Sequence, residues 1–393
     1  MLFEPVNLKD QKARIIVVGV GGGGGNALNR MIEDKMHAVD FIAINTDAQD
    51  LENNNSQTKI QIGKELTKGL GAGANSDIGK EAVVENKEII VRELNKADMV
   101  FITAGMGGGT GTGAAPAIAK ISKEIGALTV GIVTKPFAFE GPIRKKRAND
   151  GIEEMKKNCD TLLVIPNEIL LDIASDNTTV VESFKLADSV LNQATKGISD
   201  LINKPGLINL DFADVRTIMK NMGDAIMGTG IAHGEEKAIL AAQQAINSPL
   251  LQNVSIKGSK GLLVNVTGPQ EMTMRELNEA SNIIYEESGE DANVILGCVI
   301  DPTLKDEIRI TVIATGLDNN ENNIHEDGTE INFEEKYSNH STYFEEMNIV
   351  NKNIKNENLK DEKKDAENIN ETKKNIEFGN NLDVPTFLRS RKL

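Results

Sequence analysis

The chain has little of several residue types that often define a site. Its 393 residues include no tryptophan, only 2 cysteines and 4 histidines, and aromatic residues make up 4%. Cys159 and Cys298 form neither a CxxC spacing nor a framework of pairs, so we expect two reduced, buried thiols. The scattered histidines have no metal-ligand spacing, which argues against a structural zinc site.

Long apolar runs and basic regions are also missing. The longest aliphatic stretches, such as residues 15–18, are far too short to span a bilayer. The first residues lack the basic region and the small-residue cleavage site of a signal peptide, so we expect a cytoplasmic protein. The formal net charge of -16 argues against non-specific nucleic-acid binding, which relies on clustered lysine and arginine.

Glycine, in contrast, is gathered into two runs. Gly21–Gly25 and the glycine-rich stretch Gly107–Gly113 each stand between a strand-like and a helix-like stretch. Because glycine loses the most backbone entropy on folding, such runs indicate a backbone that approaches a ligand closely. Free N–H groups at the positive end of a helix favour a phosphate chain as that ligand. No GxxxxGK(S/T) pattern occurs, which excludes a Walker phosphate loop.

Charge and apolar residues are unevenly spread near the C-terminus. Residues 318–381 carry 16 acids and 8 bases, are crowded with asparagine and have almost no aliphatic clusters. Such a stretch cannot bury enough apolar surface to offset chain entropy, so we predict a disordered linker over 317–381. In residues 382–393, Val384, Phe387 and Leu388 stand beside three cations. This pattern is typical of a linear motif that orders on binding a partner.

Strand-like and helix-like stretches alternate along the first half of the chain. We expect strands over residues 13–20, 39–45, 59–62, 98–103, 128–134 and 161–165. We expect helices over 26–36, 76–95 and 113–125, the second of them capped by Ser76. This alternation predicts an α/β fold with a doubly wound parallel sheet, which binds ligands at the carboxyl ends of its strands.

A long helical pattern over residues 178–203 separates this part from a second one. There we expect helices over 235–246 and 271–286, and strands over 261–266, 293–299 and 307–314. A turn at Asp301-Pro302 predicts that the last two strands pair with each other in antiparallel fashion. The second part is therefore expected to be a mixed α+β domain.

The first glycine run alone leaves two kinds of nucleotide site open. Gly19, Gly21 and Gly24 form a GxGxxG after a strand, which also suits a Rossmann oxidoreductase with Asp40 or Asp47 as the ribose-binding acid. Residues 107–113, however, match in full the GGGTG(S/T)G signature of the tubulin and FtsZ superfamily. A Rossmann dehydrogenase needs no such second loop. The chain therefore resembles the FtsZ family, the tubulin-like cell-division GTPases, over its whole length.

That resemblance implies a site for GTP or GDP. Its phosphate-binding loops would be formed by Gly22, Gly23, Gly24, Gly25, Asn26, Gly107, Gly108, Gly109, Thr110 and Gly111. Glu140 and Arg144 match the family's ribose and phosphate contacts, and Asn167, Phe184 and Asp188 match its contacts to the base. An aspartate suits guanine because its carboxylate accepts hydrogen bonds from both N1–H and the exocyclic amine. Mg²⁺ would be held mainly through the phosphates, and no protein ligand is assigned to it.

Two aspartates after the long helix are the candidates for catalysis. Asp211 and Asp214 stand three residues apart at an expected helix start. From spacing alone they could simply stabilise the helix N-terminus, by about 0.3–1 kcal/mol each. The resemblance to the family instead implies that Asn209, Asp211 and Asp214 enter the neighbouring subunit's site beside the γ-phosphate.

The resemblance also implies an organisation and a role. The expected parts are an N-terminal extension (1–12), a GTP-binding domain (13–177), a central helix (178–204), a C-terminal activation and polymerisation domain (205–316), the linker (317–381) and a partner-binding peptide (382–393). The expected function is GTP-dependent assembly of head-to-tail filaments at the mid-cell division ring, with GTP hydrolysed to GDP and phosphate at the subunit interface. Leu382–Leu393 would bind membrane-tethering and regulatory division proteins. A nucleotide-binding scaffold that assembles without significant hydrolysis is the alternative.

Overall fold

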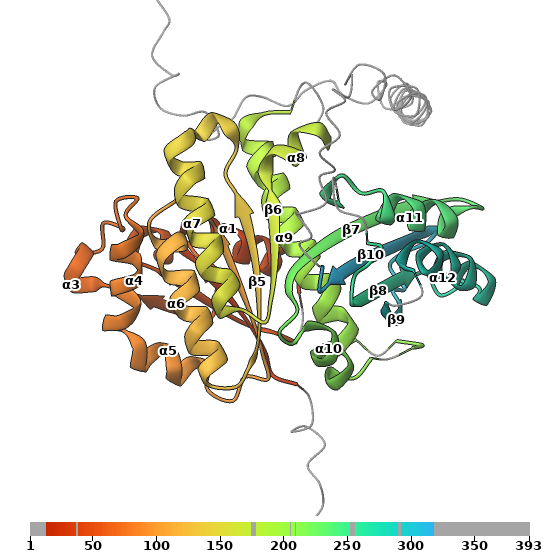
Figure 1. The fold of residues 1–393 in the computed structure, drawn as a ribbon, viewed down its shortest axis with the longest axis horizontal. Helices are drawn as coiled ribbons and strands as arrows, with labels where there is room; N and C mark the ends of the chain where they lie inside the picture. Colours follow the sequence, from red (N-terminus) through yellow and green to blue (C-terminus); the bar gives the residue numbers. More distant parts are fainter. Residues whose placement is uncertain are drawn as a thin grey trace, which may run out of the picture. The chain divides into compact units, whose positions relative to one another are not determined.

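The structure is a computed structural model that describes residues 13–36, 38–173, 178–204, 206–208, 210–251, 256–289 and 292–317. The N-terminal extension, Asn209, the terminal peptide and nearly all of the predicted linker lie outside these residues. Within them, ten strands form one sheet in the order β3-β2-β1-β4-β5-β6-β7-β10-β8-β9 (Figure 1).

The strands are β1 Ile15–Val20, β2 Asp40–Asn45, β3 Thr58–Gln61, β4 Met99–Gly105, β5 Leu128–Lys135, β6 Thr161–Pro166, β7 Gly223–His233, β8 Gly261–Gly268, β9 Asn293–Ile300 and β10 Glu307–Thr315. From β3 to β7 every pairing is parallel, so the predicted α/β fold with a parallel sheet is confirmed. β10 runs antiparallel between β7 and β8, and β9 is parallel to β8.

The predicted antiparallel pairing of the last two strands with each other is wrong. β9 and β10 both pair with β8 and lie on opposite sides of it. The reason is the helix α12 (Met274–Ser288), which crosses over between β8 and β9 and so returns the chain in the direction of β8. Once β9 occupies the edge of the sheet, the chain must pass to the far side of β8 to form β10.

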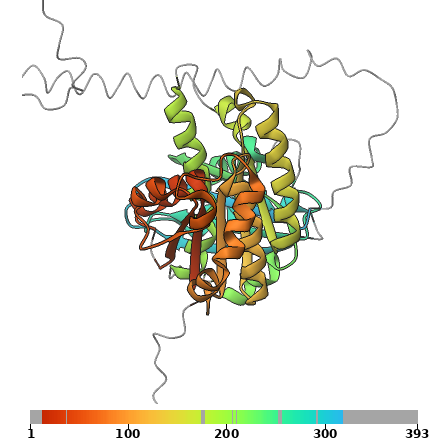
Figure 2. The ribbon, with the colours of Figure 1, turned by 90° about the vertical axis from the view of Figure 1, so that its left-hand side faces the viewer.

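The remaining helices are α1 Gly21–Glu33, α2 Ala48–Glu52, α3 Lys64–Thr67, α4 Ser76–Glu85, α5 Lys87–Leu94, α6 Thr110–Glu124, α7 Pro142–Asn158, α8 Asn167–Ile173, α9 Val180–Asn203, α10 Phe212–Met219 and α11 Lys237–Ile246, with 3₁₀ turns at Ala138–Glu140 and Pro249–Leu251. Helices α4 to α7 cover one face of the parallel strands, and α1 and α9 cover the other (Figures 1 and 2). None of the described helices combines the length and the apolar character needed to cross a membrane.

Strand β1 shows how the sheet comes to be covered on both faces. All 6 of its residues are buried. Ile15 and Val17 belong to the core that contains side chains of α1 and α9, whereas Ile16 and Val18 belong to the core that contains side chains of α4 to α7. Because neighbouring strand residues point to opposite faces, a strand covered on both sides is apolar throughout.

Helix α9 joins the two parts of the sheet. Its 24 residues extend over about 36 Å, and it contacts β5 as well as β8 and β9. A glycine lets it lie close to the second part: a Cβ atom on Gly197 would stand 3.0 Å from Cγ2 of Thr311. Asn265 Nδ2 also donates to the carbonyl oxygen of Gly197, at 3.3 Å. A further core beneath α11 and α12 belongs to the second part alone.

Three helix starts differ from the expectation. α1 begins at Gly21 and α6 at Thr110, so the first glycine run forms helical turns and is not a loop. Residues 76–95 form two helices, because the backbone at Asn86 leaves the helical region and its Oδ1 accepts from Gly63 N at 2.8 Å. Asn75, and not Ser76, caps α4, since its side chain accepts from Asp77 N at 3.0 Å.

Candidate functional site

Two helices start without a side-chain cap at the carboxyl ends of two neighbouring strands. α1 follows β1 directly and α6 follows β4 after a short turn. Neither helix has a side-chain hydrogen bond at its N-cap or an acidic residue in its first turn. α7 and α11 share both absences, whereas α2, α4, α9, α10 and α12 each have a side-chain cap. Because the first N–H groups of a helix have no intrahelical acceptor and its dipole is positive there, this pair of helix starts favours an anion.

Close backbone packing brings the two helix starts together. A Cβ atom on Gly21 would stand 2.9 Å from the backbone nitrogen of Gly111, and one on Gly23 would stand 3.2 Å from Cα of Gly105. The turn before α6 is equally crowded, since a Cβ on Gly109 would lie 2.9 Å from Asn75 N. These glycines allow three backbone segments to meet at one point of the sheet edge.

Other glycines of the two runs face open space. A Cβ atom on Gly108 would have no atom within 4 Å, and one on Gly22 would meet only the tip of the Asp50 side chain, at 3.0 Å. A cavity of about 60 Å³ beside the start of α1 is lined by Gly22, Gly25 and Asn26, among others. Gly24, by contrast, lies against β4, where a Cβ would be 2.4 Å from the carbonyl oxygen of Thr103. Gly22 and Gly108 are therefore the glycines best placed to admit a ligand.

The threonines of the second run hold the loop in shape. Thr112 Oγ1 accepts from Gly107 N at 2.8 Å, and Thr110 Oγ1 lies 2.6 Å from Thr46 Oγ1. Both Thr110 and Thr112 are buried. The hydroxyl groups thus fix the turn and tie it to the end of β2, while the backbone N–H groups remain the main donors for a ligand.

Glu140 and Arg144 form an ion pair beside the phosphate turn. Glu140 Oε1 accepts from Phe137 N at 2.9 Å, and its Oε2 lies 3.0 Å from Arg144 Nε. The Arg144 side chain is half exposed and passes close to Gly107, where a Cβ would be 2.6 Å from Arg144 Cγ. The predicted contacts are thus brought to the start of α6, where the guanidinium adds positive charge.

Aromatic side chains surround Phe184 on α9. The Phe184 ring lies edge-on to Phe137, with centroids 5.3 Å apart, and edge-on to Phe139 at 6.5 Å. Phe137 and Phe139 were not predicted as contacts to the base. Their only signal in the sequence is their place in the segment that carries Glu140. Phe137 is buried, whereas Phe139 and Phe184 are exposed, so these two rings offer an apolar surface suited to a planar base.

Two polar side chains near these rings, Asp188 and Asn167, could accept hydrogen bonds from a ligand. Asp188 follows Phe184 by one turn of α9, and burial raises the pKa of its carboxyl to about 6, while the charge of Arg30 on α1 opposes the rise. Asn167 begins α8 directly after β6, and its buried Oδ1 has no hydrogen-bond partner among the described residues. Because buried acceptors are normally hydrogen-bonded, the Asn167 Oδ1 atom is suited to accept a hydrogen bond from a ligand.

Asp211 and Asp214 are not brought to the glycine runs. They begin α10, where Asp211 Oδ1 accepts from Asp214 N at 2.9 Å and Asp214 Oδ2 accepts from Asp211 N at 3.2 Å. Arg216 of α10 donates to the carbonyl oxygen of Gly126, which lies just before β5. β5 has 8 residues and extends over about 26 Å. α10 therefore lies by the amino ends of the parallel strands, at the opposite edge of the sheet from the glycine runs, which lie by the carboxyl ends (Figure 1).

Comparison with known proteins decides which family this arrangement belongs to. Residues 14–175 match the GTPase domain of the Tubulin/FtsZ family, and residues 223–318 match the C-terminal domain of the FtsZ family. An FtsZ dimer from M. jannaschii is similar with a TM-score of 0.75 and 47% identity, over 79% of this chain and 90% of that one. This chain is a member of the FtsZ family.

Two further solved structures are similar over most of their length. A mutant FtsZ from M. jannaschii has a TM-score of 0.76 and 47% identity, over 79% of this chain and 93% of that chain. CetZ2 from Haloferax volcanii, solved as a GTPγS-bound protofilament, has a TM-score of 0.67 over 78% of this chain and 94% of that chain. At 20% identity it shows the fold alone.

Membership of the family confirms the main functional prediction. The chain is a tubulin-like GTPase that binds GTP and GDP, and a cell-division protein that forms protofilaments with copies of itself. The Rossmann oxidoreductase interpretation of the first glycine run is therefore wrong. Its GxGxxG glycines serve helix packing at the start of α1, as the close approach of Gly24 to β4 shows.

Proposed function

We propose that this chain assembles head to tail into filaments at the cytoplasmic division ring at mid-cell, and that each GTP is hydrolysed between two subunits. One subunit supplies the two uncapped helix starts, and the next supplies Asn209, Asp211 and Asp214. The observation that carries the proposal is the separation of these two groups by the length of a strand within one chain. A second copy stacked edge to edge would bring them together.

The residues of each half suit their roles. Backbone N–H groups at the starts of α1 and α6, with the Arg144 guanidinium, stabilise negative charge on the phosphates. Asp188, Asn167 and Phe184 bind the base, and Glu140 positions the ribose. Asp211 and Asp214 each use one carboxylate oxygen in the capping box, so the other oxygen of each is free to orient an attacking water.

Magnesium fits this arrangement through the substrate. Among the described residues, no three His, Cys, Asp or Glu side chains converge to hold a metal. Bound Mg²⁺ would supply positive charge to the β- and γ-phosphates, with its ligands mainly phosphate oxygens and water.

Exposed apolar side chains near both edges support the edge-to-edge contact. Near the glycine runs, Leu70 is 83% exposed and Phe139 is 64% exposed. Near α10, Leu207 is 69% exposed. Apolar side chains in such positions are typical of surfaces that become buried in an assembly. Because the two edges differ, the contact is heterologous and produces an open filament, not a closed dimer.

The predicted division into parts and the role of the terminal peptide belong to the same proposal. The domains over 13–177 and 205–316 would carry nucleotide binding and assembly, with the helix 178–204 between them. Leu382–Leu393, at the end of the linker 317–381, would bind membrane-tethering and regulatory division proteins. Its apolar and cationic side chains support a short motif that docks into a partner's groove.

Mixing two inactive variants tests the shared site directly. Asp214→Asn keeps a side-chain oxygen that can accept from Asp211 N but removes the charge, so the variant should bind GTP and fail to hydrolyse it. Asp188→Ala should fail to bind GTP while retaining Asp211 and Asp214. In a mixture, an Asp188→Ala subunit can complete the site of an Asp214→Asn subunit, so phosphate release should exceed that of either variant alone.

Three results would contradict the shared site. The mixture could release no more phosphate than the two variants separately, or Asp214→Asn could lose GTP binding itself. Turnover per subunit of the unaltered protein could also stay constant on dilution below the concentration for assembly. Circular dichroism of both variants provides the control for folding.

A further inference from the structure

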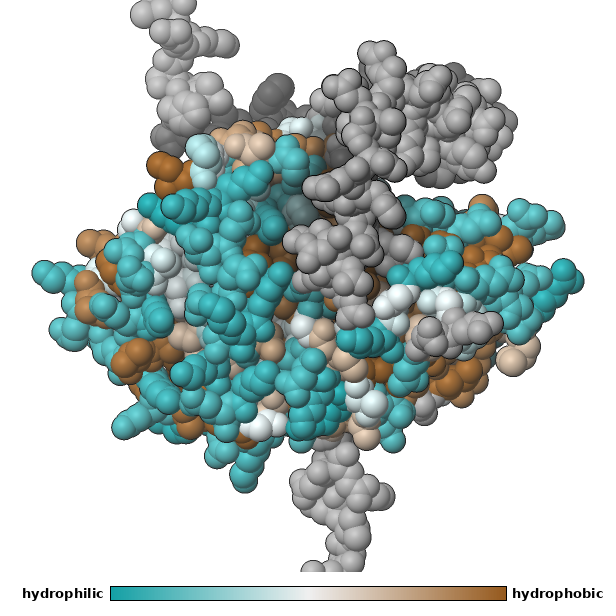
Figure 3. Space-filling view, in the orientation of Figure 1, coloured by the Kyte–Doolittle hydropathy of each residue, from teal (hydrophilic) through white to brown (hydrophobic). Residues whose placement is uncertain are grey.

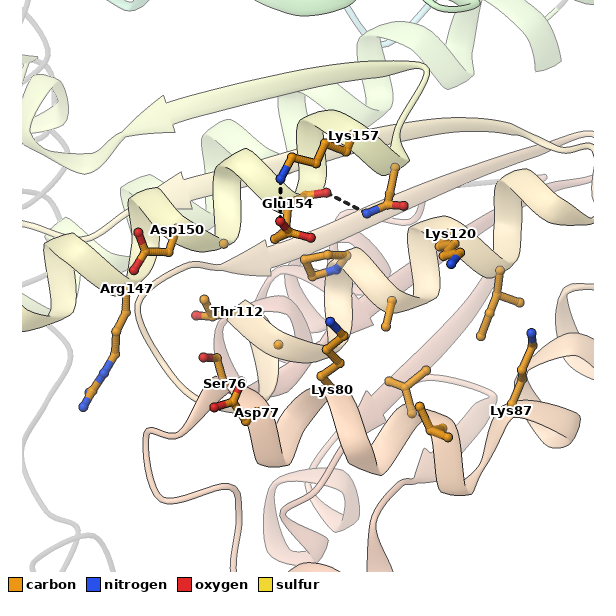
Figure 4. Close-up of a pocket in the computed structure, with 18 of the residues that line it drawn as sticks. Ser76, Asp77, Lys80, Lys87, Thr112, Lys120, Arg147, Asp150, Glu154 and Lys157 are labelled. Atoms are coloured by element: carbon orange, nitrogen blue, oxygen red, sulfur yellow. Dashed lines mark hydrogen bonds and ion pairs between the residues drawn. The ribbon is translucent and has the colours of Figure 1, made fainter.

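A groove of about 500 Å³ lies on the face of the sheet covered by α4, α6 and α7. α4 and α7 form its sides and α6 forms its floor (Figure 4). Its lining includes Lys80, Val84, Pro116, Lys120 and Glu154. The proposed nucleotide and catalytic residues do not line it, so it is a separate feature of the molecule.

The groove is closed at one end and open along about three turns of helix. At the closed end the helices touch: a Cβ atom on Gly113 would stand 1.8 Å from Ser76 O, and one on Gly151 would stand 2.5 Å from Thr112 Cγ2. The lining then continues along α6 as far as Glu124. From Thr112 to Glu124 a helix rises about 18 Å, which is the length of a partner helix of roughly 12 residues.

The groove combines an apolar strip with charged sides. Pro116 and Ala117 form part of the floor, and Val84 on the rim of α4 is 70% exposed. Covering an aliphatic side chain this exposed is favourable, because it removes apolar surface from water. The strip therefore offers anchor points for apolar side chains spaced along one face of a helix.

Two lysines in the groove form no ion pair with another described residue. Lys87 pairs with Glu124 at 3.3 Å, and Lys157 pairs with Glu154 at 2.7 Å. Lys80 and Lys120, by contrast, have no ion pair within 4.0 Å and no hydrogen bond in the described part of the chain. Lys80 still acts on Glu154, because the hydrogen bond from Lys157 and, to a smaller extent, the charge of Lys80 lower the pKa of that carboxyl. Figure 4 shows Lys80 reaching from α4 across the groove toward α7.

The acids of the groove do not cancel this pair of charges. Asp77 lies in the first turn of α4, where the helix dipole favours a negative charge, and Asp150 lies on α7 toward the closed end. Glu154 serves both Lys157 and Lys80, and the five cations of the lining exceed its four acids. In a chain whose net charge is -16, this excess of positive charge beside an exposed apolar strip favours a negatively charged partner.

The groove also lies where a filament would leave it accessible. It opens on the largely hydrophilic face over α4 to α7 (Figure 3), between the two sheet edges that the proposed head-to-tail contact would bury. Each subunit of a filament would therefore present one copy of the groove along its side. A partner with several such helices could bind many subunits at once.

We propose that the groove between α4, α6 and α7 binds an acidic amphipathic helix of another protein. The partner helix is about three turns long, places apolar side chains on Val84, Pro116 and Ala117, and directs carboxylates to Lys80 and Lys120. This recognition needs neither GTP hydrolysis nor the subunit interface, so it can be tested apart from the proposed shared site.

The test uses a fluorescein-labelled synthetic peptide of about 15 residues, composed of Leu, Ala and Glu with Leu recurring at helical spacing. Fluorescence anisotropy measures its binding to the full chain. We expect saturable binding, with a dissociation constant about tenfold or more higher for the double variant Lys80→Glu/Lys120→Glu, because each replacement turns an attraction into a repulsion. Val84→Gln should weaken binding by removing an apolar anchor.

Matched controls separate recognition from general electrostatics. Lys80→Arg/Lys120→Arg keeps both charges and should bind the peptide as the unaltered chain does. Lys305→Glu changes an exposed lysine outside the groove and should leave the dissociation constant unchanged. A labelled fluorescent GDP should bind the Lys80→Glu/Lys120→Glu variant normally, which shows that it is folded.

The proposal is overturned if the Lys80→Glu/Lys120→Glu variant binds the acidic peptide as tightly as the unaltered chain. It is also overturned if a scrambled peptide of the same composition, without the apolar spacing, binds equally well. Equal weakening by Lys305→Glu would likewise count against it, because the groove would then have no special part.

Discussion

The proposed contact between Asp188 and guanine predicts that nucleotide binding depends on pH. Burial raises the pKa of its carboxyl from a model-compound value of 3.8 to about 6. Guanine presents two N–H donors, so it binds the ionised carboxylate and not the protonated acid. Binding should therefore draw the pKa of Asp188 back toward its ordinary value, and affinity should fall as the pH drops through about 6.

The size of the effect follows from the two pKa values. At about pH 5, a carboxyl with a pKa of about 6 is ionised in roughly one molecule in ten. The dissociation constant should therefore be about tenfold higher at pH 5 than at pH 7.5, which corresponds to about 1.4 kcal/mol. Above pH 7 the profile should be flat, because the carboxylate is then fully ionised.

A fluorescence titration with a labelled GDP measures this profile, and Asp188→Asn is the matched variant. The asparagine offers one oxygen in place of two, so affinity should drop about 10- to 100-fold at pH 7.5, as expected for lost hydrogen bonds to a charged group. This difference should shrink about tenfold by pH 5, where most of the Asp188 carboxyl is protonated. The terminal phosphate of GDP also titrates near pH 6. Its contribution is shared by both proteins and cancels in the ratio of their dissociation constants. A ratio that does not change between pH 5 and 7.5 would refute the role assigned to Asp188.

Three further predictions concern the glycine runs, the helix cap and a buried thiol. Gly108→Ala should leave the melting temperature nearly unchanged but weaken GDP binding. Gly24→Ala should lower the free energy of unfolding by about 1–3 kcal/mol, because its Cβ would collide with Thr103 O. Equal losses of stability in the two variants would contradict this. In urea unfolding, Asp211→Ala should cost about 1 kcal/mol and Asp211→Asn little, because asparagine also caps helices; the same loss in both would rule out the cap. Burial raises the pKa of Cys159 to about 12, so iodoacetamide at pH 8 should modify it only after unfolding, as intact mass would show.

The glycine runs show how much of the site the sequence could predict. Their composition indicated close backbone approach and a phosphate ligand, and both helices do begin there without caps. Composition could not separate glycines that pack from those that face a ligand. Gly24 must be glycine because a Cβ atom would collide with the carbonyl oxygen of Thr103. A Cβ atom on Gly108 would meet no described atom within 4 Å. That distinction depends on which strand lies behind each residue, which is a property of the tertiary fold.

Two missed elements have identifiable physical causes. β7 contains glycines that weaken a strand pattern, but they are there because α11 lies directly on the strand: a Cβ on Gly228 would be 1.9 Å from Ala245 O, and one on Gly230 would be 2.0 Å from Ala241 O. α7 is mostly polar, because only a narrow stripe that includes Ala148 and Met155 is buried. The residues of β7 are thus determined by the helix packed on it, and those of α7 by its exposure to solvent. Intrinsic strand or helix propensity decides neither sequence.

Asp211 and Asp214 admitted two interpretations from their spacing, as helix caps or as catalytic groups, and the structure shows that the two are compatible. Each carboxylate gives one oxygen to the capping box and keeps the other. Because the cap already fixes both side chains in the folded subunit, their ordering adds little entropic cost to assembly. In the proposed shared site, the catalytic half would thus be preformed on α10, and assembly would need only to bring the neighbouring subunit's nucleotide beside it. Charge, which asparagine removes while keeping the cap, is therefore the property that separates the two roles in experiment.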